Sequence, residues 1–555
     1  MTQINRRAIL GATALAGFAP AGGAWAETRG LSPGVFTHSV ASGDPLRDRV
    51  MLWTRFATPD GSVGRLAWEV AEDEAFTKVA ARGAASASPL DDYCAKVDAK
   101  GLKPDGRYFY RFLSASGPSP VGRTRTAPAA GKAPFTLALF SCSNLPFGYF
   151  NAYAHAAARE DIDLCVHVGD YIYEYGRGTY PAAAEVVRGP ALEPATEIVR
   201  LADYYQRYAT YRADPDLQEL HRLKPFATVW DDHELANDAW WTGAQNHQPD
   251  SEGAWVDRRA AAFKAYADWM PIRTSRAEPF RIYRSLDWGE TASLLLLDTR
   301  LIGREQPLNW QAAIAPVLAE GEAAVARAVG ALAQGPLADP KRTLLGAKQE
   351  AWLAAELQRS KARGAAWAVL AQQVIFGRLL GSGGAGKLLP DDASEGTRRF
   401  VGLSGQLGQA GLEFNLDAWG GYPAARARLI GAAQGFGPNV SILAGDSHNC
   451  WLNDIPGQGG VAAVEFAGGS VASPGLERTL SKAAEGAREA LVQGANAGLR
   501  FADLTHRGYG VLRYTPARLE AEWIAMGPPA QRSPAPKQVT RFAVEAGAAK
   551  GWQAA

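Results

Sequence analysis

Residues 165–176 read Cys-Val-His-Val-Gly-Asp-Tyr-Ile-Tyr-Glu-Tyr-Gly, an apolar run with β-branched residues that stops at a Gly-Asp pair. Such a run predicts a buried strand, and Asp170 then stands at the carboxyl end of that strand. Open α/β sheets place their functional sites at this edge. The stretch therefore predicts an acidic site residue on an inner strand of an α/β sheet, followed by three spaced tyrosines.

The same pattern continues on both sides of this stretch. Candidate strands are the compact apolar runs at residues 135–140, 164–168, 227–230, 293–297, 366–374 and 440–444. Helical patterns lie between them, including residues 317–332 and 348–361. Because strands alternate with helices, we expect a layered α/β domain over residues 135–530.

The chain before this domain has a different pattern. Residues 33–127 alternate apolar and polar side chains in short bursts, and turns rich in Gly, Pro and Asp separate these bursts. This pattern is typical of a small all-β sandwich domain. Residues 126–132, Thr-Ala-Pro-Ala-Ala-Gly-Lys, have the composition of a linker between the two domains.

Four candidate strands end in residues of the types that bind metals. The residues concerned are Cys142, Asp170, Asp231, Asp232, His233, Asp446 and His448. One acid at a strand end is ordinary helix capping, because Asp accepts hydrogen bonds from the first amides of a following helix. Four such ends in one domain favour a metal site.

Together these segments resemble the PhoD-type alkaline phosphatases, a branch of the calcineurin-like metallophosphoesterases. The resemblance also includes Ser42-Gly43-Asp44-Pro45, Leu52-Trp53-Thr54-Arg55, Leu297-Asp298-Thr299-Arg300, Gln373-Val374 and Gly468-Gly469-Ser470. It extends from about residue 35 to residue 515, with the motifs in one order. It implies a four-layer αββα metallophosphoesterase sandwich preceded by a fibronectin-like β-sandwich domain.

The residue types indicate two kinds of metal ion. Ferric iron accepts thiolate and tyrosinate beside carboxylate and imidazole, and Cys142, Asp170, Tyr173 and His448 form such a set. Asp170, Asp232 and Asp446 form an all-oxygen set, which calcium prefers. With Asp170 bridging, the two sets predict a dinuclear centre, and the resemblance implies the same pair, Fe³⁺ and Ca²⁺.

For some residues in or near these motifs, a structural role is an alternative to metal binding. Asn144, Asp231 and Asn237 stay open as further ligands or as residues that support the ligands. Taken singly, Cys142 or any of the tyrosines would more often be a packing residue. We expect Cys165 to be a buried core residue, and we expect Asp298 and Arg300 to form a structural ion pair.

The resemblance implies a phosphoric ester hydrolase of the alkaline phosphatase D type. In a dinuclear centre, a metal-bound hydroxide attacks phosphorus in line with the leaving group. His233 lies beside Asp232 and is the candidate acid that protonates the leaving alkoxide. Phosphate monoesters and diesters both suit such a centre, and the alternative is a phosphodiesterase or phospholipase D-like activity at the same metals. Residues 180–196 and 379–411 are candidate walls of the substrate pocket.

The amino terminus resembles a twin-arginine export signal. Arg6 and Arg7 precede a weakly apolar stretch, and Ala24-Trp25-Ala26 offers a cleavage point, so residues 1–26 form the predicted signal peptide. We therefore expect the twin-arginine machinery as a partner and a periplasmic or secreted location. The same machinery exports folded proteins, often with a metal already bound.

Composition limits the other partners. The chain has 555 residues, 58 of them basic and 57 acidic, and its formal net charge is +1. This balance gives no electrostatic reason to expect nucleic acid or an anionic membrane as a partner. A monomer is the default expectation.

Three rival readings remain. Residues 381–388 are similar to the glycine-rich phosphate-binding loop of nucleotide-binding proteins. Leu388, however, occupies the position where that loop needs a Ser or Thr to hold magnesium. Ser447 and His506 resemble the nucleophile and base of SGNH-type serine esterases, at an unusual spacing and position. A non-enzymatic binding protein would suit the β-sandwich but would leave the metal-binding residue types without a role.

Overall fold

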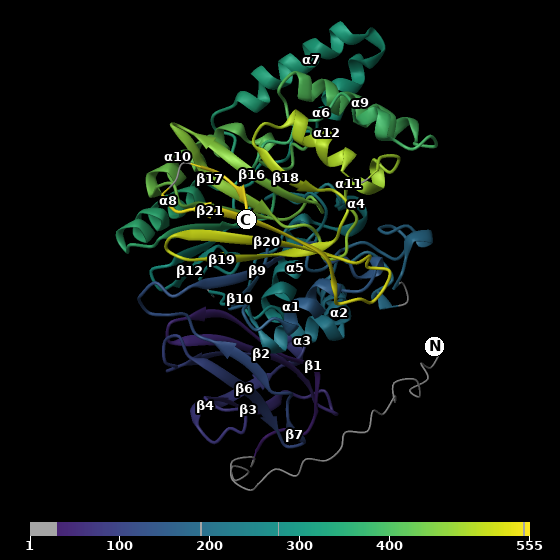
Figure 1. The fold of residues 1–555 in the computed structure, drawn as a ribbon. Coiled ribbons are helices and arrows are strands. Elements are labelled where there is room, and N and C mark those ends of the chain that lie inside the picture. Colours follow the sequence, from purple (N-terminus) through teal and green to yellow (C-terminus); the bar gives the residue numbers. More distant parts are fainter. Residues whose placement is uncertain (1–29, 189–190, 276, 485, 548–549) are drawn as a thin grey trace, which may run out of the picture.

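The computed structural model describes residues 30–188, 191–275, 277–484, 486–547 and 550–555. The predicted signal peptide at residues 1–26 lies outside these described residues. Within them, the strands form sheets of ten, seven and five members (Figure 1). No helix in the described part of the chain combines the length and the apolar character that a membrane span needs.

The ten-stranded sheet holds the stretch that opened the sequence analysis. Its order is β22-β21-β20-β19-β9-β10-β11-β1-β2-β5. The bounds are β22 Gln553–Ala554, β21 Pro536–Glu545, β20 Arg518–Met526, β19 Gly508–Tyr514, β9 Phe135–Phe140, β10 Leu164–His167, β11 Pro225–Thr228, β1 Val35–Leu46, β2 Arg49–Ala57 and β5 Cys94–Lys100. Strands β9, β10 and β11 are parallel, so their carboxyl ends lie at one edge.

The seven-stranded sheet has the order β12-β13-β14-β15-β17-β16-β18. The bounds are β12 Arg284–Trp288, β13 Ala292–Leu296, β14 Trp367–Ala371, β15 Val440–Ala444, β17 Gly460–Ala467, β16 Cys450–Gly457 and β18 Leu499–Asp503. Strands β13, β14 and β15 are parallel as well. Each of the two large sheets therefore presents a row of parallel strand ends.

Helices cover the outer faces of both large sheets, which makes the predicted αββα sandwich. Those beside the ten-stranded sheet are α1 Asn151–Ala158, α2 Leu201–Arg212, α3 Pro215–Leu223 and α5 Trp255–Trp269, and the short α4 Pro249–Glu252 precedes α5. Helices α8 Gly346–Ala362 and α10 Pro423–Phe436 cover the seven-stranded sheet.

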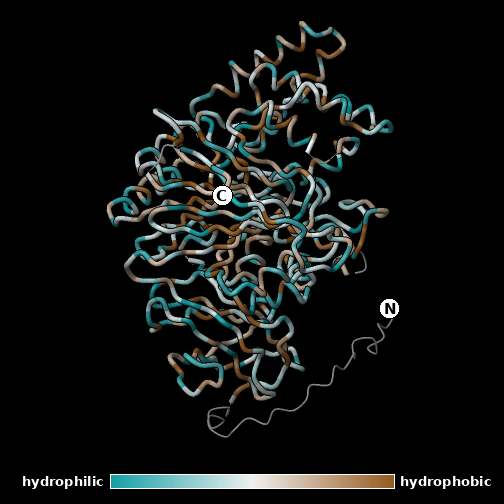
Figure 2. Tube along the Cα trace, viewed as in Figure 1, coloured by the Kyte–Doolittle hydropathy of each residue, from teal (hydrophilic) through white to brown (hydrophobic). Residues whose placement is uncertain are grey.

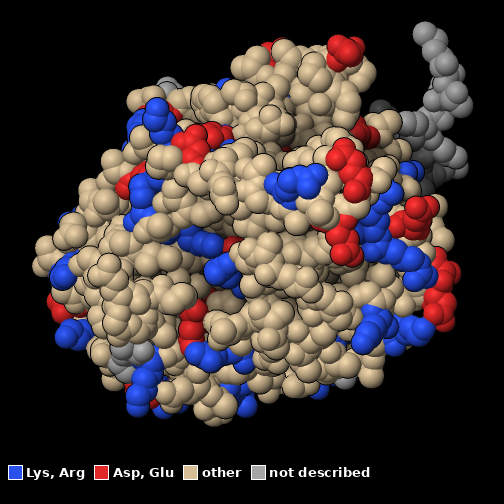
Figure 3. Space-filling model, turned by 90° about the horizontal axis from the view of Figure 1, so that it is seen from above, with Lys and Arg blue, Asp and Glu red and all other residues tan. Residues whose placement is uncertain are grey.

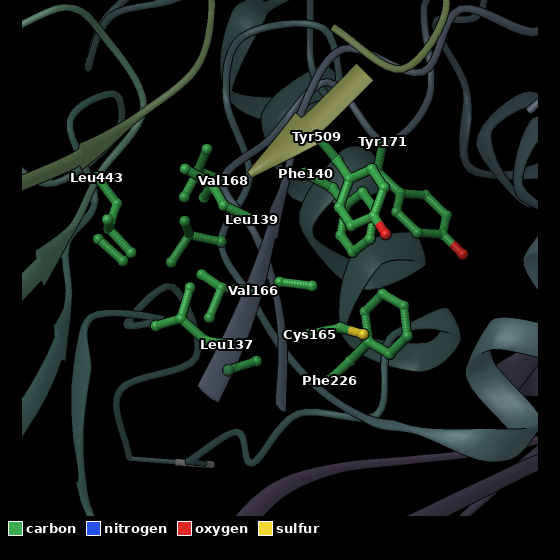
Figure 4. Packing of buried hydrophobic residues seen from close by; sticks show 14 of the residues in the cluster. Leu137, Leu139, Phe140, Cys165, Val166, Val168, Tyr171, Phe226, Leu443 and Tyr509 are labelled. Atoms are coloured by element: carbon green, nitrogen blue, oxygen red, sulfur yellow. The ribbon is translucent and has the colours of Figure 1, made fainter. Parts of the chain in front are cut away.

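Successive side chains of a strand point to opposite faces of the sheet, so they pack against different layers of the molecule. Figure 4 shows Leu139 and Val168 on one side of the first sheet, toward Leu443 of the second sheet, with Cys165 and Phe226 on the other side. Apolar segments accordingly run along the strands in the middle of the molecule (Figure 2). Cys165 is a buried core residue, as the sequence indicates.

The front β-sandwich shares a sheet with the αββα sandwich. Its second sheet is β4 Val79–Ala87, β3 Gly64–Ala71, β6 Arg107–Ser114, β7 Gly117–Pro118 and β8 Gly122–Arg125. Its first sheet is β1, β2 and β5, and β1 pairs in parallel with β11, with Ser42 opposite Pro225. The predicted linker at residues 126–132 is also bound on both sides, because Ala127 N donates to Leu46 O and Gly289 N donates to Pro128 O. One continuous sheet thus joins the two parts.

Most of the remaining helices lie in the upper part of Figure 1, with α11 below them, and we call all of them together the helical cap. It consists of α6 Trp310–Ile314, α7 Glu322–Gln334, α9 Glu395–Gln409, α11 Leu476–Thr479 and α12 Ala487–Ala495. Helices α6, α7 and α9 share a small apolar core of their own. Seen from above in Figure 3, this side of the molecule carries basic and acidic side chains interspersed among uncharged ones.

Predicted boundaries differ from the observed ones where buried loops follow strands. The predicted strands at 227–230 and 366–374 end at Thr228 and Ala371, and the chain continues as buried loop. An apolar run indicates that a segment is buried, but it does not show whether that segment is a strand or a loop. The predicted helix at 317–332 is divided at Gly321, whose φ of +94° ends a 3₁₀ helix before α7 begins.

Candidate metal centre

The site lies where strand ends of the two large sheets meet. Cys142, after β9, donates its backbone N–H to the carbonyl of Gly169, after β10, at 3.2 Å. Gly445, after β15, packs on Ser141 so closely that a Cβ at Gly445 would lie 2.6 Å from the Ser141 Cβ. Three strands that are far apart in sequence thus deliver their loops to one place.

The backbone at these loops adopts a conformation that non-glycine residues rarely take. Cys142, Asp170, Asp446 and His448 have φ values of 60°, 56°, 62° and 63°. A left-handed conformation costs about 1–3 kcal/mol for such residues and persists where the surroundings enforce it. Four of the six predicted metal ligands are therefore held in strained backbone at a site, which is where such strain concentrates.

Cys142, Asp170 and His448 each offer one ligand atom, and these atoms all lie within 4.8 Å of one another. The Tyr173 hydroxyl joins them, 3.1 Å from an Asp170 carboxylate oxygen and 3.3 Å from His448 Nε2. His448 Nδ1 lies 2.8 Å from the carbonyl of Pro474, so Nδ1 carries the proton and Nε2 is left as an acceptor. The structure brings the predicted iron set together.

A carboxylate-rich group adjoins it. Asp231, Asp232 and Asp446 offer ligand atoms within 4.8 Å of one another, and so do Asp170, Asp232 and His233. Asp170 belongs both to the group with Cys142 and to the group with Asp232 and His233, but not to the group of Asp231, Asp232 and Asp446. The predicted calcium set of Asp170, Asp232 and Asp446 is distributed over these two overlapping groups.

Arg300 is the buried cation beside these acids. Its guanidinium lies 2.7 Å from Asp417 and 3.4 Å from Asp446, and it also pairs with Asp231. The expected ion pair with Asp298 is wrong, because the Asp298 carboxylate instead accepts the backbone N–H groups of Arg300 and Leu301. Sequence proximity suggested Asp298 as partner, whereas the fold turns the Arg300 side chain toward the site.

One arginine leaves this acidic group with an excess of negative charge. Burial raises the pKa of Asp446 and of Asp170 well above the usual range of a carboxyl group. Burial likewise raises the pKa of the Cys142 thiol and of the Tyr173 hydroxyl. Burial alone would raise the pKa of Asp232 too, but Arg300 and His233 outweigh it and lower that pKa. Added cations would offset the repulsion and favour the ionised ligands.

Two oxygen atoms identify where cations fit. Asp170 Oδ1 and Asp231 Oδ2 are buried and have no hydrogen-bond partner among the described residues. An unpaired buried carboxylate oxygen is costly, and a metal ion is one of the few groups that satisfies it. The donor set therefore fits metal ions, with thiol, phenol and imidazole on one side of Asp170 and carboxylates on the other.

His233 lies against this centre with its ring fixed. Its Nδ1 is 2.7 Å from Glu174 Oε2, and its ring stacks on that of Tyr173 at 4.2 Å between centroids. Burial lowers the pKa of His233, but the charges of Glu174, Asp232 and Asp170 outweigh it, so the pKa lies well above its usual range. A raised pKa is the direction that the predicted acid role requires.

Glu234 supports the strand ends, a role that the sequence analysis missed. Its carboxylate accepts the backbone N–H groups of Asp170, Tyr171 and Asp231 at 3.1, 2.7 and 2.8 Å. It ties the loop after β10 to the loop after β11. Glu174 lies inside the stretch at residues 165–176, and Glu234 directly follows His233, so adjacency to predicted site residues was the available signal.

The residues left open have other partners. Asn144 donates to the Tyr180 carbonyl at 3.3 Å and accepts from the Tyr211 hydroxyl at 3.4 Å. The Asn237 side chain donates to Gln245, while its backbone N–H donates to Glu174. Both asparagines thus have protein partners near the site, whereas Asp231 keeps one unpaired oxygen.

The contacts disfavour the rival sites. Ser447 Oγ accepts a hydrogen bond from Trp451 at 2.7 Å. His506 lies between Asp503 and Lys537, with its Nε2 2.7 Å from the Lys537 amine. The ring nitrogen that an esterase would aim at its serine thus faces a lysine. The near-nucleotide loop contributes a 3₁₀ helix, Ala385–Leu388, beside the helical cap.

Comparison with known proteins agrees with this architecture. The family model described as PhoD-like phosphatase matches residues 137–523, and that of the PhoD-like phosphatase N-terminal domain matches residues 22–128. The chain belongs to the PhoD-like phosphatase family. It is 36% identical over 463 residues to alkaline phosphatase D of Bacillus subtilis (strain 168), covering 79% of this chain and 70% of that protein.

A solved structure of PhoD supports the same assignment. It superposes with a TM-score of 0.75 at 31% identity and covers 94% of this chain and 92% of that chain. As a PhoD-like phosphatase with this fold, the protein is a phosphoric ester hydrolase. Its clusters of metal-binding residue types lie at the strand ends where the αββα sheets meet.

Proposed function

We propose that this PhoD-like phosphatase is an exported enzyme that hydrolyses phosphate mono- or diesters at a centre of one ferric and one calcium ion. The observation that carries the proposal is Asp170, which belongs to two ligand groups and keeps a buried oxygen without a protein partner. Cys142, Tyr173 and His448 would hold iron with Asp170, because thiolate and phenolate suit a ferric ion. Asp232 and Asp446 would hold calcium.

The reaction adds water across a P–O ester bond, so that an alcohol and a phosphate are released. The bound cations would withdraw charge from the phosphoryl oxygens and would lower the pKa of nearby water. His233, held by Glu174 and stacked on Tyr173, would give its proton to the leaving oxygen. Arg300 would keep Asp231 and Asp446 in place beneath the substrate.

The pocket walls would choose between monoesters and diesters. The Tyr180 ring lies 6.1 Å from the Tyr173 ring and 5.7 Å from the Tyr175 ring, measured between centroids. The segment that begins at Tyr180 would therefore supply one wall. Residues 379–411, which include helix α9 of the helical cap, would supply another wall.

Export rests on the amino-terminal sequence alone. Arg6 and Arg7 with the following Ala-rich stretch are typical of a twin-arginine signal, which gives a periplasmic or secreted protein. All four cysteines are buried and unpaired in the structure, so the fold requires no disulfide in an oxidising compartment.

The first test is iron and calcium analysis of the folded protein, with a visible spectrum before and after calcium chelation. We expect iron with a charge-transfer colour from the Cys142 and Tyr173 ligands, and activity that is lost with calcium and restored by it. Tyr173→Phe should shift the colour, whereas Tyr171→Phe should leave it unchanged, because the Tyr171 hydroxyl faces His221 at 2.8 Å. A colourless, iron-free, fully active protein would overturn the proposed centre.

The second test addresses His233. His233→Ala should lower kcat by about 10²–10⁴-fold on alkyl phosphates, whose leaving groups need a proton, and far less on nitrophenyl phosphates. His155→Ala is the control, because His155 pairs with Tyr509 outside the centre. Full turnover of alkyl phosphates by a His233→Ala protein that keeps its metals would exclude the acid role.

A further inference from the structure

A charged cavity lies between the front sandwich and the αββα sandwich. It has a volume of about 230 Å³. Strands β6 and β8 of the front sandwich line one side, and the segments 160–163 and 223–225, which lead into β10 and β11, line the other. The candidate metal centre lies at the opposite, carboxyl ends of β10 and β11. The cavity is therefore separate from the site of the proposed chemistry.

Three arginines of the front sandwich line this cavity. They are Arg107 on β6 and Arg123 and Arg125 on β8. Arg107 lies opposite Arg125 in the register of the two strands. Like charges that face each other across neighbouring strands repel, so this arrangement requires anions nearby.

The acids of the lining compensate only part of the positive charge. Each of the three has its own cation, because Glu72 pairs with Lys103, Glu160 with Arg123 and Asp163 with Arg125. Arg125 is shared with a further acid, Asp105, outside the lining. Two cations of the lining, Arg107 and Lys224, have no ion pair with any described residue.

Lys224 is a buried cation without a partner. The residue is only 4% exposed, and its amine forms no side-chain hydrogen bond or ion pair among the described residues. Burial lowers the pKa of this amine, which shows that the charged form lacks stabilisation there. A buried charge is costly unless it is paired, so an anion in the cavity would satisfy Lys224.

Lys224 and Arg107 act at the same place in the cavity. Arg123 lowers the pKa of the Glu160 carboxyl, and the charges of Lys224 and Arg107 lower it further. Arg125 adds an Nε that is buried and has no hydrogen-bond partner in the described part of the chain. A guanidinium offers several N–H donors in a fork that matches the oxygens of a carboxylate, sulfonate or phosphate.

The other lining side chains are apolar or aromatic, and they include Phe109 and Ile162. We propose that this cavity binds a small organic anion, with its oxyanion group at Lys224 and Arg107 and its apolar body against Phe109 and Ile162. Arg107 belongs to the front sandwich, whereas Lys224 belongs to the αββα sandwich. The bound anion would therefore connect the two parts and stabilise their contact.

The first test is titration calorimetry of the metal-loaded protein with benzenesulfonate at low salt. This probe has an oxyanion and an apolar ring, and a sulfonate is a weak ligand for metal ions. We expect one molecule to bind per chain, with an affinity that falls as salt is added. Benzyl alcohol, the uncharged control, should not bind. Absence of benzenesulfonate binding, or equal binding of benzyl alcohol, would overturn the proposal.

Two substitutions locate the bound anion. Lys224→Met and Arg107→Gln should each weaken binding by about tenfold or more, because each removes a charged hydrogen-bond donor. Neither side chain has a protein partner to lose, so both variants should fold and keep wild-type phosphatase activity. Lys100→Met and Arg65→Gln are the matched controls, since they remove the same charges from exposed positions on β5 and β3, outside the cavity.

The control variants should bind benzenesulfonate as the wild type does. Unchanged binding in Lys224→Met and Arg107→Gln would show that the anion binds elsewhere and would overturn the proposal. Benzenesulfonate should also raise the unfolding temperature of the wild-type protein with increasing concentration, because a ligand that binds the folded state stabilises it. The same additions should leave the unfolding temperature of Lys224→Met unchanged.

Phosphatase activity separates this site from the proposed function. An active, metal-loaded protein that does not bind benzenesulfonate refutes only the anion site. A protein that binds benzenesulfonate at Lys224 but hydrolyses no phosphate ester supports the anion site and refutes the proposed function.

Discussion

Glu234 shows how much of this site depends on single side chains outside the candidate ligands. Its two carboxylate oxygens satisfy three backbone amides from the loops after β10 and β11. Asp170 lies on one of these loops in a strained left-handed conformation. The carboxylate of Glu234 therefore contributes to ligand geometry through the backbone, without being a ligand itself.

Glu234→Gln should destabilise the protein by about 1–3 kcal/mol, because the amide –NH₂ cannot accept a hydrogen bond and leaves a buried N–H unpaired. The same change should lower the metal content, since the Asp170 loop loses its anchor. Both are measured on purified protein, by denaturant unfolding and by elemental analysis.

The control for that change is Glu69→Gln. Glu69 is also buried and pairs with Arg111 in the front sandwich, 2.8 Å away. It should cost stability while the metal content stays at the wild-type level. Equal metal content in the Glu69 and Glu234 variants would show that Glu234 has no part in the centre.

At the scale of elements, the loops that follow the strands form the site. These loops approach each other so closely that there is no room for a side chain at the point of contact. Gly169 follows β10 with a φ of +111°, and a Cβ there would lie 2.3 Å from the Asp231 Cβ. The Asp170 and Asp231 loops can approach each other only because this residue is glycine. In the Gly-Asp pair, the glycine thus allows the two loops to approach each other, and the aspartate that follows is the candidate ligand.

Gly169→Ala should cost about 2–5 kcal/mol, because strain from the positive φ adds to overpacking against Asp231. The loops must separate, so activity should fall with metal content. Gly431→Ala in α10 is the matched control, since a Cβ there meets no atom within 4 Å. That control should gain about 0.5–1 kcal/mol, as expected for a helix interior. Normal metal content in the Gly169 variant would contradict the role we give to the close approach.

At the scale of the whole molecule, the front sandwich and the αββα sandwich are joined through the backbone. Strand β1 pairs with β11, and Asp44 on β1 accepts hydrogen bonds from Arg273 N at 2.8 Å and from Arg284 Nη2 at 2.6 Å. Arg284 begins β12 of the seven-stranded sheet. The Ser-Gly-Asp-Pro motif therefore connects the front sandwich to both large sheets of the αββα sandwich.

Because of this joint, calorimetry should show a single unfolding transition for both parts. Asp44→Asn should lower its temperature without splitting it, since breaking a buried ion pair costs about 3–5 kcal/mol. Asp105→Asn is the control, because Asp105 also has a positive φ but pairs with Arg125 at the surface. Two separate transitions in the wild-type protein would show that the sandwiches unfold independently.

Local patterns in the sequence predicted a layered α/β domain, the front β-sandwich and most of the inner strands, because buried strands and helical periods are local. The αββα arrangement of the layers came from the resemblance to the PhoD-type phosphatases. The sequence also predicted the residues that the structure gathers at the site, because Cys142, Asp170, Asp446 and His448 directly follow strand ends. Parallel strands bring their carboxyl ends to one edge, so a local position already implies a shared location.

The tertiary structure decided what depends on contacts between distant segments. Arg300 pairs with Asp231, Asp417 and Asp446 rather than with Asp298, and Glu234 binds backbone from another strand end. The shared sheet through β1 and β11 and the cavity between the two sandwiches likewise join residues far apart in sequence. A pattern along the chain records which side chains are buried, whereas the partner of each buried group is set only when the chain folds.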